Sequence, residues 1–278
     1  MSSHVYLCII AALAILVAGC VADQSAATSA AAVDGDAAAL LIRLQSEITE
    51  ALEDLDDRLA YAAYDLGKTG LSGDDARGIL ANLSDTDPSI VDCVAADAGG
   101  TIVAAEPAAY RDAEGTKIRN QSHVRHILMT KRPILSEMIT VVEGFPATVI
   151  AAPIFDDETD GSRFVGFAAT VFRPDDLIAG VAGPAANGTP YQVMVIQTDG
   201  RVLYDTDPAQ IGKMTFEDPL YADYPELLDV AHLVADERYG TATYEFTADG
   251  QTVQKEITWT TAGLHGMEWR VAVIQAVG

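Results

Sequence analysis

Basic residues are scarce in this sequence. Its 278 residues include 17 Lys and Arg against 41 Asp and Glu, which gives a formal net charge of −24. A surface with this charge repels nucleic acid and anionic lipid head groups, so neither is an expected partner. The acidic residues are spread along the chain without a block of like sign. This pattern favours a solvated acidic surface over an acidic functional tail.

Cysteine is also rare. The three cysteines are Cys8, Cys20 and Cys93, and the first two lie in the N-terminal apolar region. Cys93 stands alone in an apolar stretch, so it has no partner for an intramolecular disulfide, and no catalytic cysteine motif surrounds it. We therefore expect Cys93 to be a small buried core residue.

Catalytic and metal-binding motifs are missing as well. The sequence has no Gly-x-Ser-x-Gly elbow, no His-Glu-x-x-His and no phosphate loop. His123 and His126 are three residues apart, but no cysteine or third histidine lies nearby, so no metal site is expected. The acid-dense stretch at residues 156–160 lacks the EF-hand spacing and favours a hairpin turn. We expect neither a cofactor nor enzymatic activity.

The longest apolar run lies at the N-terminus, where residues 5–20 read VYLCIIAALAILVAGC. Its apolar part, about fourteen residues, is shorter than the ~20 that a membrane-spanning helix needs. The ending Val17-Ala18-Gly19-Cys20 is similar to a lipobox, which predicts a signal peptide over residues 1–19 and lipidation of Cys20. The protein would then be held at the extracytoplasmic cell surface. The first four residues contain no Lys or Arg, so an uncleaved membrane anchor stays open.

A flexible tether and a long helix follow. Residues 20–36 are small and polar without periodicity, as in a linker. Leucines and other apolar residues then recur every three or four positions, which predicts one helix over residues 37–66 within a helix-and-connector segment, 37–88. The apolar stripe is wider than a coiled-coil seam, so we expect it to pack along a globular body.

The remaining chain repeats one pattern twice. VDCVAADAGGTIVAAEP and YQVMVIQTDGRVLYDTDP are each a strand, a Gly-containing turn, a second strand and an acid-Pro step. Further strands and helices follow each of them. The pattern predicts two antiparallel-sheet units, residues 89–183 and 191–278, joined by a linker at 184–190.

Four segments carry a resemblance to a known family. They are QSHVRHILMTKRPILSE at 121–137, ATVIAAPIFDDETDGSRFVGFAAT at 147–170, QTDGRVLYDTDPAQIGK at 197–213 and WTTAGLHGMEWRVAV at 259–273. In order and spacing, the chain resembles double Cache (dCache) domains, the extracellular sensor modules of chemoreceptors and sensor kinases. The resemblance implies an α+β fold: a long N-terminal helix followed by two PAS-like units with antiparallel sheets, the first distal to the membrane and the second proximal.

The resemblance also implies a ligand site in the distal unit. In the amino-acid-binding branch of the family, an Arg before the distal helix grips the ligand carboxylate, and that position is Gln121 here. An aromatic residue of the family maps to His123, and the Asp that holds the ligand amine maps near Thr170 or Val171. Because both charged positions are uncharged here, a buried zwitterion would lack partners. We expect a small polar ligand without a strong fixed charge.

The predicted ligand-binding residues are uncharged hydrogen-bonding groups of the distal unit. They are Gln121, His123, Ser136, Thr148 and Thr170. Tyr204 and Tyr244 of the proximal unit are the fallback site.

These observations predict a lipid-anchored extracellular sensor that binds a small molecule. No output segment follows Gly278, so we expect it to act with a separate transmembrane signalling partner. A structural or adhesive surface lipoprotein without a ligand is the alternative, and a secreted hydrolase on an unrecognised fold is a further one.

Overall fold

The computed structural model describes residues 34–142, 144–156, 163–248 and 251–277. The predicted signal peptide and the lipidation site at Cys20 lie outside the described residues. Within the described part of the chain, every helix is too short or too polar to cross a membrane.

Helix α1 (Gly35–Thr69) is the longest element of the fold. Asp34 caps its start by accepting a hydrogen bond from the backbone N–H of Asp36 at 3.0 Å. At 1.5 Å per residue its 35 residues extend about 52 Å. Its buried side chains recur every three or four positions, from Leu40 to Leu66, which places them on one face. The expectation of a single long N-terminal helix is confirmed.

The first unit contains an antiparallel sheet with the strand order β2-β1-β6-β5-β3, and β4 pairs with β5. The elements are β1 (Ile90–Asp97), β2 (Ile102–Glu106), η1 (Ala108–Ala113), α3 (Ser122–Thr130), β3 (Ile134–Leu135), β4 (Ile139–Thr140), β5 (Pro146–Asp156) and β6 (Arg163–Phe172).

The second unit contains a five-stranded antiparallel sheet with the order β8-β7-β11-β10-β9. The elements are β7 (Gln192–Gln197), β8 (Val202–Asp205), η3 (Pro208–Gln210), η4 (Pro219–Tyr221), α5 (Pro225–Asp236), β9 (Gly240–Ala248), β10 (Gln251–Leu264) and β11 (Met267–Ala276). In both sheets the hairpin strands occupy one edge and the last strand of the unit lies next to them, as expected for an internal repeat.

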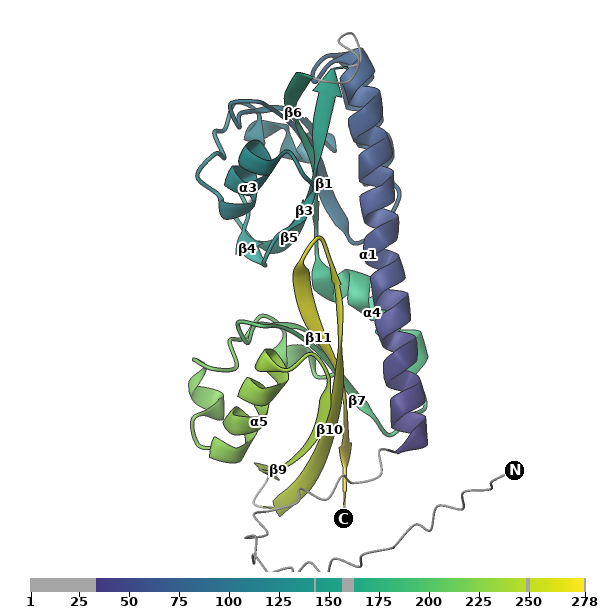
Figure 1. Cartoon of the computed structure of the whole chain (residues 1–278), viewed down its shortest axis with the longest axis vertical. Helices are drawn as coiled ribbons and strands as arrows, with labels where there is room; N and C mark the ends of the chain where they lie inside the picture. The colour runs from purple at the N-terminus through teal and green to yellow at the C-terminus, as the bar shows by residue number, and fades with distance from the viewer. Residues whose placement is uncertain (1–33, 143, 157–162, 249–250, 278) are drawn as a thin grey trace, which may run out of the picture. The chain divides into compact units, whose positions relative to one another are not determined.

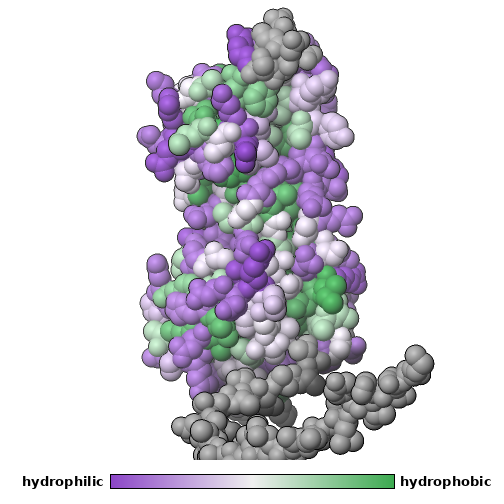
Figure 2. All heavy atoms as spheres, in the orientation of Figure 1, coloured by the Kyte–Doolittle hydropathy of each residue, from purple (hydrophilic) through white to green (hydrophobic). Residues whose placement is uncertain are grey.

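Each sheet is covered on both faces. Figure 1 shows α1 along one face of both sheets, with α3 and α5 on the opposite side of the first and second sheet. A single apolar core joins α1 to both sheets; it includes Leu44 and Leu55 of α1, Ile150 of β5 and Val271 of β11. Two smaller cores lie on the other faces, around α3 and around α5. Figure 2 shows hydrophilic side chains spread over the visible face, with hydrophobic ones in separated patches.

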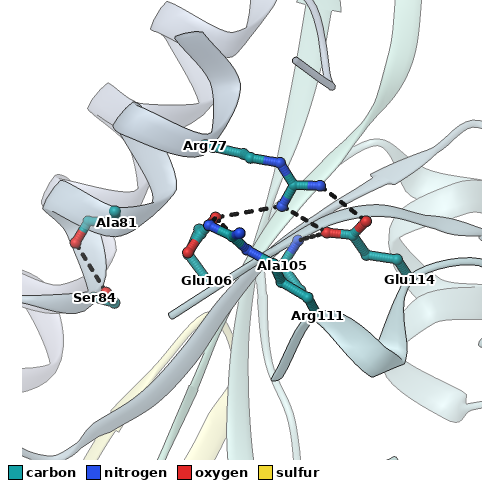
Figure 3. A network of polar contacts seen from close by, with 7 residues as sticks. All are labelled: Arg77, Ala81, Ser84, Ala105, Glu106, Arg111 and Glu114. Atoms are coloured by element: carbon teal, nitrogen blue, oxygen red, sulfur yellow. Dashed lines mark hydrogen bonds and ion pairs between the residues drawn. The ribbon is translucent and has the colours of Figure 1, made fainter. Parts of the chain in front are cut away.

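Two helices differ from the sequence prediction. Helix α2 (Asp74–Ser84) lies in the segment predicted as a connector. Its Arg77 donates to both carboxylate oxygens of Glu114 at 2.7 and 2.9 Å and reaches Glu106 at 3.3 Å, which ties α2 to the first unit (Figure 3). Helix α4 (Pro174–Ala186) continues three residues into the predicted linker and includes Pro184, although an interior proline disfavours a helix.

Candidate functional site

Gln121 and His123 lie together at the start of α3. Both line a cavity of about 30 Å³ between α3 and the first sheet. That volume is on the order of the space needed by one or two water molecules. Burial lowers the pKa of the His123 imidazole to about 4, and its Nδ1 has no hydrogen-bond partner among the described residues.

The other three predicted residues lie elsewhere. The Ser136 hydroxyl donates to the Glu137 carbonyl at 2.6 Å and accepts from the Val149 N–H at 2.9 Å, so it fastens β3 to β5. Thr170 Oγ1 lies 3.7 Å from Cys93 Sγ, and Cys93 belongs to the core that contains α1. Thr148 is on the same sheet face as Ile150, two residues along β5, and also faces that core. The structure therefore brings together Gln121 and His123 but not the complete predicted set.

The first unit fills its own interior with apolar side chains. Val94, Val149, Phe167 and Val171 line the small cavity, and Phe167 is fully buried. This filling leaves little room for a ligand in the conformation described.

A much larger cavity lies at the corresponding place in the second unit. Its volume is about 590 Å³, which is within the usual range for small-molecule sites. It lies between the sheet and a cover made of α5 and the segment that precedes α5. Apolar side chains such as Met194, Ile196, Val202, Leu227 and Ile257 form much of its lining.

Hydrogen bonds link three polar side chains in the lining of this cavity. Gln192 Nε2 donates to Asp205 Oδ1 at 2.9 Å, and Gln192 Oε1 accepts from Lys255 Nζ at 3.2 Å. The backbone N–H of Asp207 also donates to Asp205 Oδ1, at 2.8 Å. Asp205 Oδ2 accepts no hydrogen bond from any described residue. Because Asp205 is only 4% exposed, burial raises the pKa of its carboxyl.

Aromatic side chains form a second part of the lining. They are Tyr221, Tyr224, Tyr244 and Phe246. The rings of Tyr224 and Phe246 pack with centroids 4.9 Å apart. Burial raises the pKa of Tyr244 to about 12, and that of Tyr221 to about 12 as well, with nearby carboxylates adding to both shifts. Of the two fallback tyrosines, Tyr244 lines this cavity, whereas Tyr204 packs in the core that contains α1.

The strand registers show that the second unit has an acidic residue where the first unit has alanine. Val94 pairs with Ala105 and Ala169, and Met194 pairs with Asp205 and Ala272, so Asp205 occupies the position of Ala105.

Lys255 is related to the first unit in the same way. Ile257 of the second unit and Val149 of the first pair with corresponding residues of the last strands of their sheets. Lys255 lies two residues before Ile257, as Ala147 lies two residues before Val149, so Lys255 occupies the position of Ala147. Sequence reasoning missed Asp205 and Lys255. Comparison of the two repeats could have found them, because Asp205 and Lys255 each stand where the first unit has an alanine.

Arg270 holds the helix that covers the cavity. Its Nε donates to the carbonyls of Val234 and Glu237 at 3.1 and 3.0 Å, and its Nη2 donates to that of Ala235 at 3.1 Å. These are carbonyls at the C-terminal end of α5, which lack partners within the helix. Arg270 is 3% exposed, so it fixes α5 from inside the unit.

No group of three or more His, Cys, Asp and Glu is arranged to hold a metal ion within residues 34–277, as far as they are described.

Comparison with known proteins gives one family match. Residues 50–174 match the family described as HK/GC/Chemotaxis protein-like, sensor domain. The search of curated proteins found no match. The extracellular ligand binding receptor from Desulfohalobium retbaense DSM5692 is 29% identical, with a TM-score of 0.72 over 87% of this chain. This chain spans 40% of that receptor chain.

Two ligand-bound structures are similar at lower identity. One is the ligand binding domain of the amino acid chemoreceptor PctB of Pseudomonas aeruginosa PAO1 with L-Gln, at 15% identity and a TM-score of 0.60, covering 87% of this chain and 90% of that one. The other is the ligand-binding domain of the Pseudomonas fluorescens chemoreceptor CtaA with L-leucine, at 16% identity and a TM-score of 0.58, covering 84% and 90%. The chain has the fold of double Cache ligand-binding domains, and the resemblance predicted from its sequence is confirmed.

Proposed function

We propose that this protein is an extracytoplasmic sensor that binds a small molecule, with the cavity of the second unit as its binding site. The observation that carries the proposal is the cavity of about 590 Å³ lined by apolar, aromatic and a few polar side chains. Concave sites with that lining are typical of ligand pockets. The match of residues 50–174 to a sensor-domain family supports the same function.

A thermal-shift screen of the purified full chain tests this proposal. A panel of organic acids, amines, purines and sugars should contain a compound that raises the melting temperature, because a ligand at a hundred times its Kd adds about 2.7 kcal/mol to stability. Ala231→Phe should abolish that shift, since Ala231 of α5 lines the cavity. Ala209→Phe, the same change at an exposed position, is the control. The proposal fails if no compound stabilises the protein, or if Ala231→Phe leaves the shift intact while the fold is retained.

The site around Gln121 and His123 stays a prediction. If the ligand binds there, His123→Ala and Gln121→Ala should each weaken binding by roughly ten- to a hundredfold, since each removes a buried hydrogen bond. Full affinity in the double variant would exclude the first unit and leave the cavity of the second unit as the site.

We also propose that the protein is anchored by a lipid at Cys20, which is supported by the sequence Val17-Ala18-Gly19-Cys20. The intact mass of membrane-extracted protein should show the loss of residues 1–19 and the gain of a lipid. Stable retention needs two or more acyl chains. A protein that still carries Met1 to Gly19 would exclude this anchor.

A separate signalling partner also stays a prediction. Chemical crosslinking on intact cells, followed by purification with and without the stabilising compound, would detect it. A ligand-dependent crosslink to one membrane protein is the expected result.

A further inference from the structure

The second unit buries a carboxylate at a position where the fold does not need one. Asp205 stands where the first unit has Ala105, and Ala105 is fully buried in an otherwise similar sheet. Burying a carboxylate costs several kcal/mol more than burying a methyl group unless it is paired. Since alanine occupies the equivalent position of the first unit, the shared framework of the two sheets does not require this carboxylate.

The partners of Asp205 leave one of its oxygens available. Both of its hydrogen bonds, from Gln192 and from the backbone of Asp207, end on Oδ1. No cation of the described residues lies within ion-pair distance of it, and Lys255 contacts Gln192 instead. Asp205 therefore lines a large cavity with one carboxylate oxygen, Oδ2, that has no donor from the described chain.

The charges and rings around the cavity favour a cation over an anion. Among its lining residues, Asp205 and Asp207 carry negative charge and Lys255 carries positive charge, which gives a net charge of −1 at neutral pH. Asp218 adds a further negative charge near Tyr221. Phe246 already contacts a cation, the Lys255 ammonium, at 5.2 Å from its centroid. Aromatic faces attract organic ammonium groups in this way.

We propose that the cavity binds a protonated amine with an apolar body, its ammonium group on Asp205 Oδ2 and its body against the aromatic and aliphatic walls. This inference rests on the proposed function and adds the class of ligand. The ammonium would supply the missing donor to Oδ2 and the missing counter-charge to a buried carboxylate. Lys255 would stay on Gln192 and Phe246, without a direct role in holding the amine.

Four probes of similar size and different charge test the assignment. They are 2-phenylethylamine, 2-phenylethanol, 3-phenylpropionate and L-phenylalanine, measured by titration calorimetry on the full chain at pH 7. The amine should bind at least about tenfold more tightly than each of the other three, because only it pairs its charge with Asp205 without placing a carboxylate in the cavity.

Substitutions of Asp205, with one control, assign the effect to this residue. Asp205→Asn keeps the size of the side chain and should weaken amine binding by about ten- to a hundredfold. Asp205→Ala introduces the residue that the first unit has at this position, and it takes the place of Asp205→Asn in the test if that variant does not fold. Asp229→Asn removes the same charge from an exposed position of α5 and should leave the affinity unchanged.

A substitution of Lys255 distinguishes an amine ligand from a zwitterion. Lys255→Met should leave amine binding unchanged or tighten it, because a repelling charge is removed. A ligand that places a carboxylate on Lys255 would instead lose affinity.

The assignment to amines is overturned by any of three results: the amine does not bind, the propionate or the zwitterion binds as tightly, or Asp205→Asn and Asp205→Ala bind the amine as the wild type does. The proposed sensor function survives each of these, since it is tested separately, by the wider compound panel and by Ala231→Phe.

Discussion

At the residue scale, the two units differ by a few side chains placed on the same framework. Phe167 pairs with Ala96 and Arg270 pairs with Ile196, each partner directly before its hairpin turn. In the first unit the phenylalanine ring lies in the space under α3, whereas the guanidinium of Arg270 bonds to the end of α5. Together with the exchange of Ala105 for Asp205, this explains why one unit is filled and the other is hollow.

Only part of the candidate site could be predicted from the sequence. Of the residues that line the larger cavity, Tyr244 was predicted, as part of the fallback site. Family resemblance indicated the segment before α3, with Gln121 and His123, and ligand binding there stays a prediction. Thr148 and Thr170 were assigned to the right strands, but alternate strand residues face opposite sides, and a shift of one position reverses the side. Cavity volume depends on side chains from many strands and helices, so composition and periodicity do not reveal it.

His123 gives a prediction about pH. The folded protein keeps the imidazole neutral down to about pH 4, while in the unfolded chain it protonates near its usual 6.5. Between these values the unfolded state binds more protons, so the free energy of unfolding rises with pH across this range. When the pH is lowered from 7.5 to 5, the free energy of unfolding measured in urea should therefore fall by about 2 kcal/mol less in His123→Gln than in the wild type.

The control is His126→Gln, which changes an exposed histidine of the same helix. It should retain the pH dependence of the wild type. Equal pH dependence in His123→Gln and the wild type would show that His123 is not buried as described.

At the element scale, long periodic segments were predicted well and short ones poorly. The apolar stripe of α1 and the paired strands of both repeats have strong periodicity. Helix α2 has only three buried side chains, Ala76, Leu80 and Leu83, and its N-cap is a glycine without a side-chain hydrogen bond. A short helix with a weak cap and a Gly-rich start gives little signal, because tertiary packing stabilises it.

Leu55 tests the packing of α1. The side chain is 2% exposed and lies in the core shared by both sheets. Leu55→Ala should lower the free energy of unfolding by about 2–5 kcal/mol, since it removes buried surface and leaves a cavity. Ile42→Ala on the same helix, where the side chain is 68% exposed, should change it by less than about 0.5 kcal/mol. Equal effects in urea denaturation would contradict the assigned face.

Arg270 tests the attachment of α5. Arg270→Met would leave the carbonyls of Val234 and Ala235 without the guanidinium donor, and each buried unpaired group costs about 1–3 kcal/mol, whereas the Glu237 carbonyl keeps the Trp259 indole N–H. We expect a lower melting temperature and faster hydrogen exchange in the last turn of α5. Arg238→Met, which removes an exposed guanidinium paired with Glu268, should show neither effect. Normal exchange in α5 of Arg270→Met would refute this role.

At the scale of the whole molecule, the two units share one core. Helix α1 packs on β5 of the first sheet and on β10 of the second. Polar contacts add to this packing. The N–H of Met138 in the first unit donates to Gln197 Oε1 of the second at 2.7 Å, and His265 Nε2 of the second unit lies 2.8 Å from Asp56 Oδ1 of α1. Helix α1 thus covers apolar surface of both sheets within one core.

Calorimetry should therefore show one unfolding transition. The calorimetric and van't Hoff enthalpies of the full chain should agree, because a common core makes the units unfold together. Two separated transitions, or an enthalpy ratio well above one, would mean that the units are independent.

The shared helix has a consequence for communication. A compound in the proposed site of the second unit would stabilise β10, and β10 is packed on the same helix that supports β5. If binding there changes the stability of the first unit, linkage requires that a change in the first unit alters the affinity of the second by the same factor. If the proposed site is correct, a substitution in the first unit would then change the affinity of the second unit without altering any residue that lines the cavity.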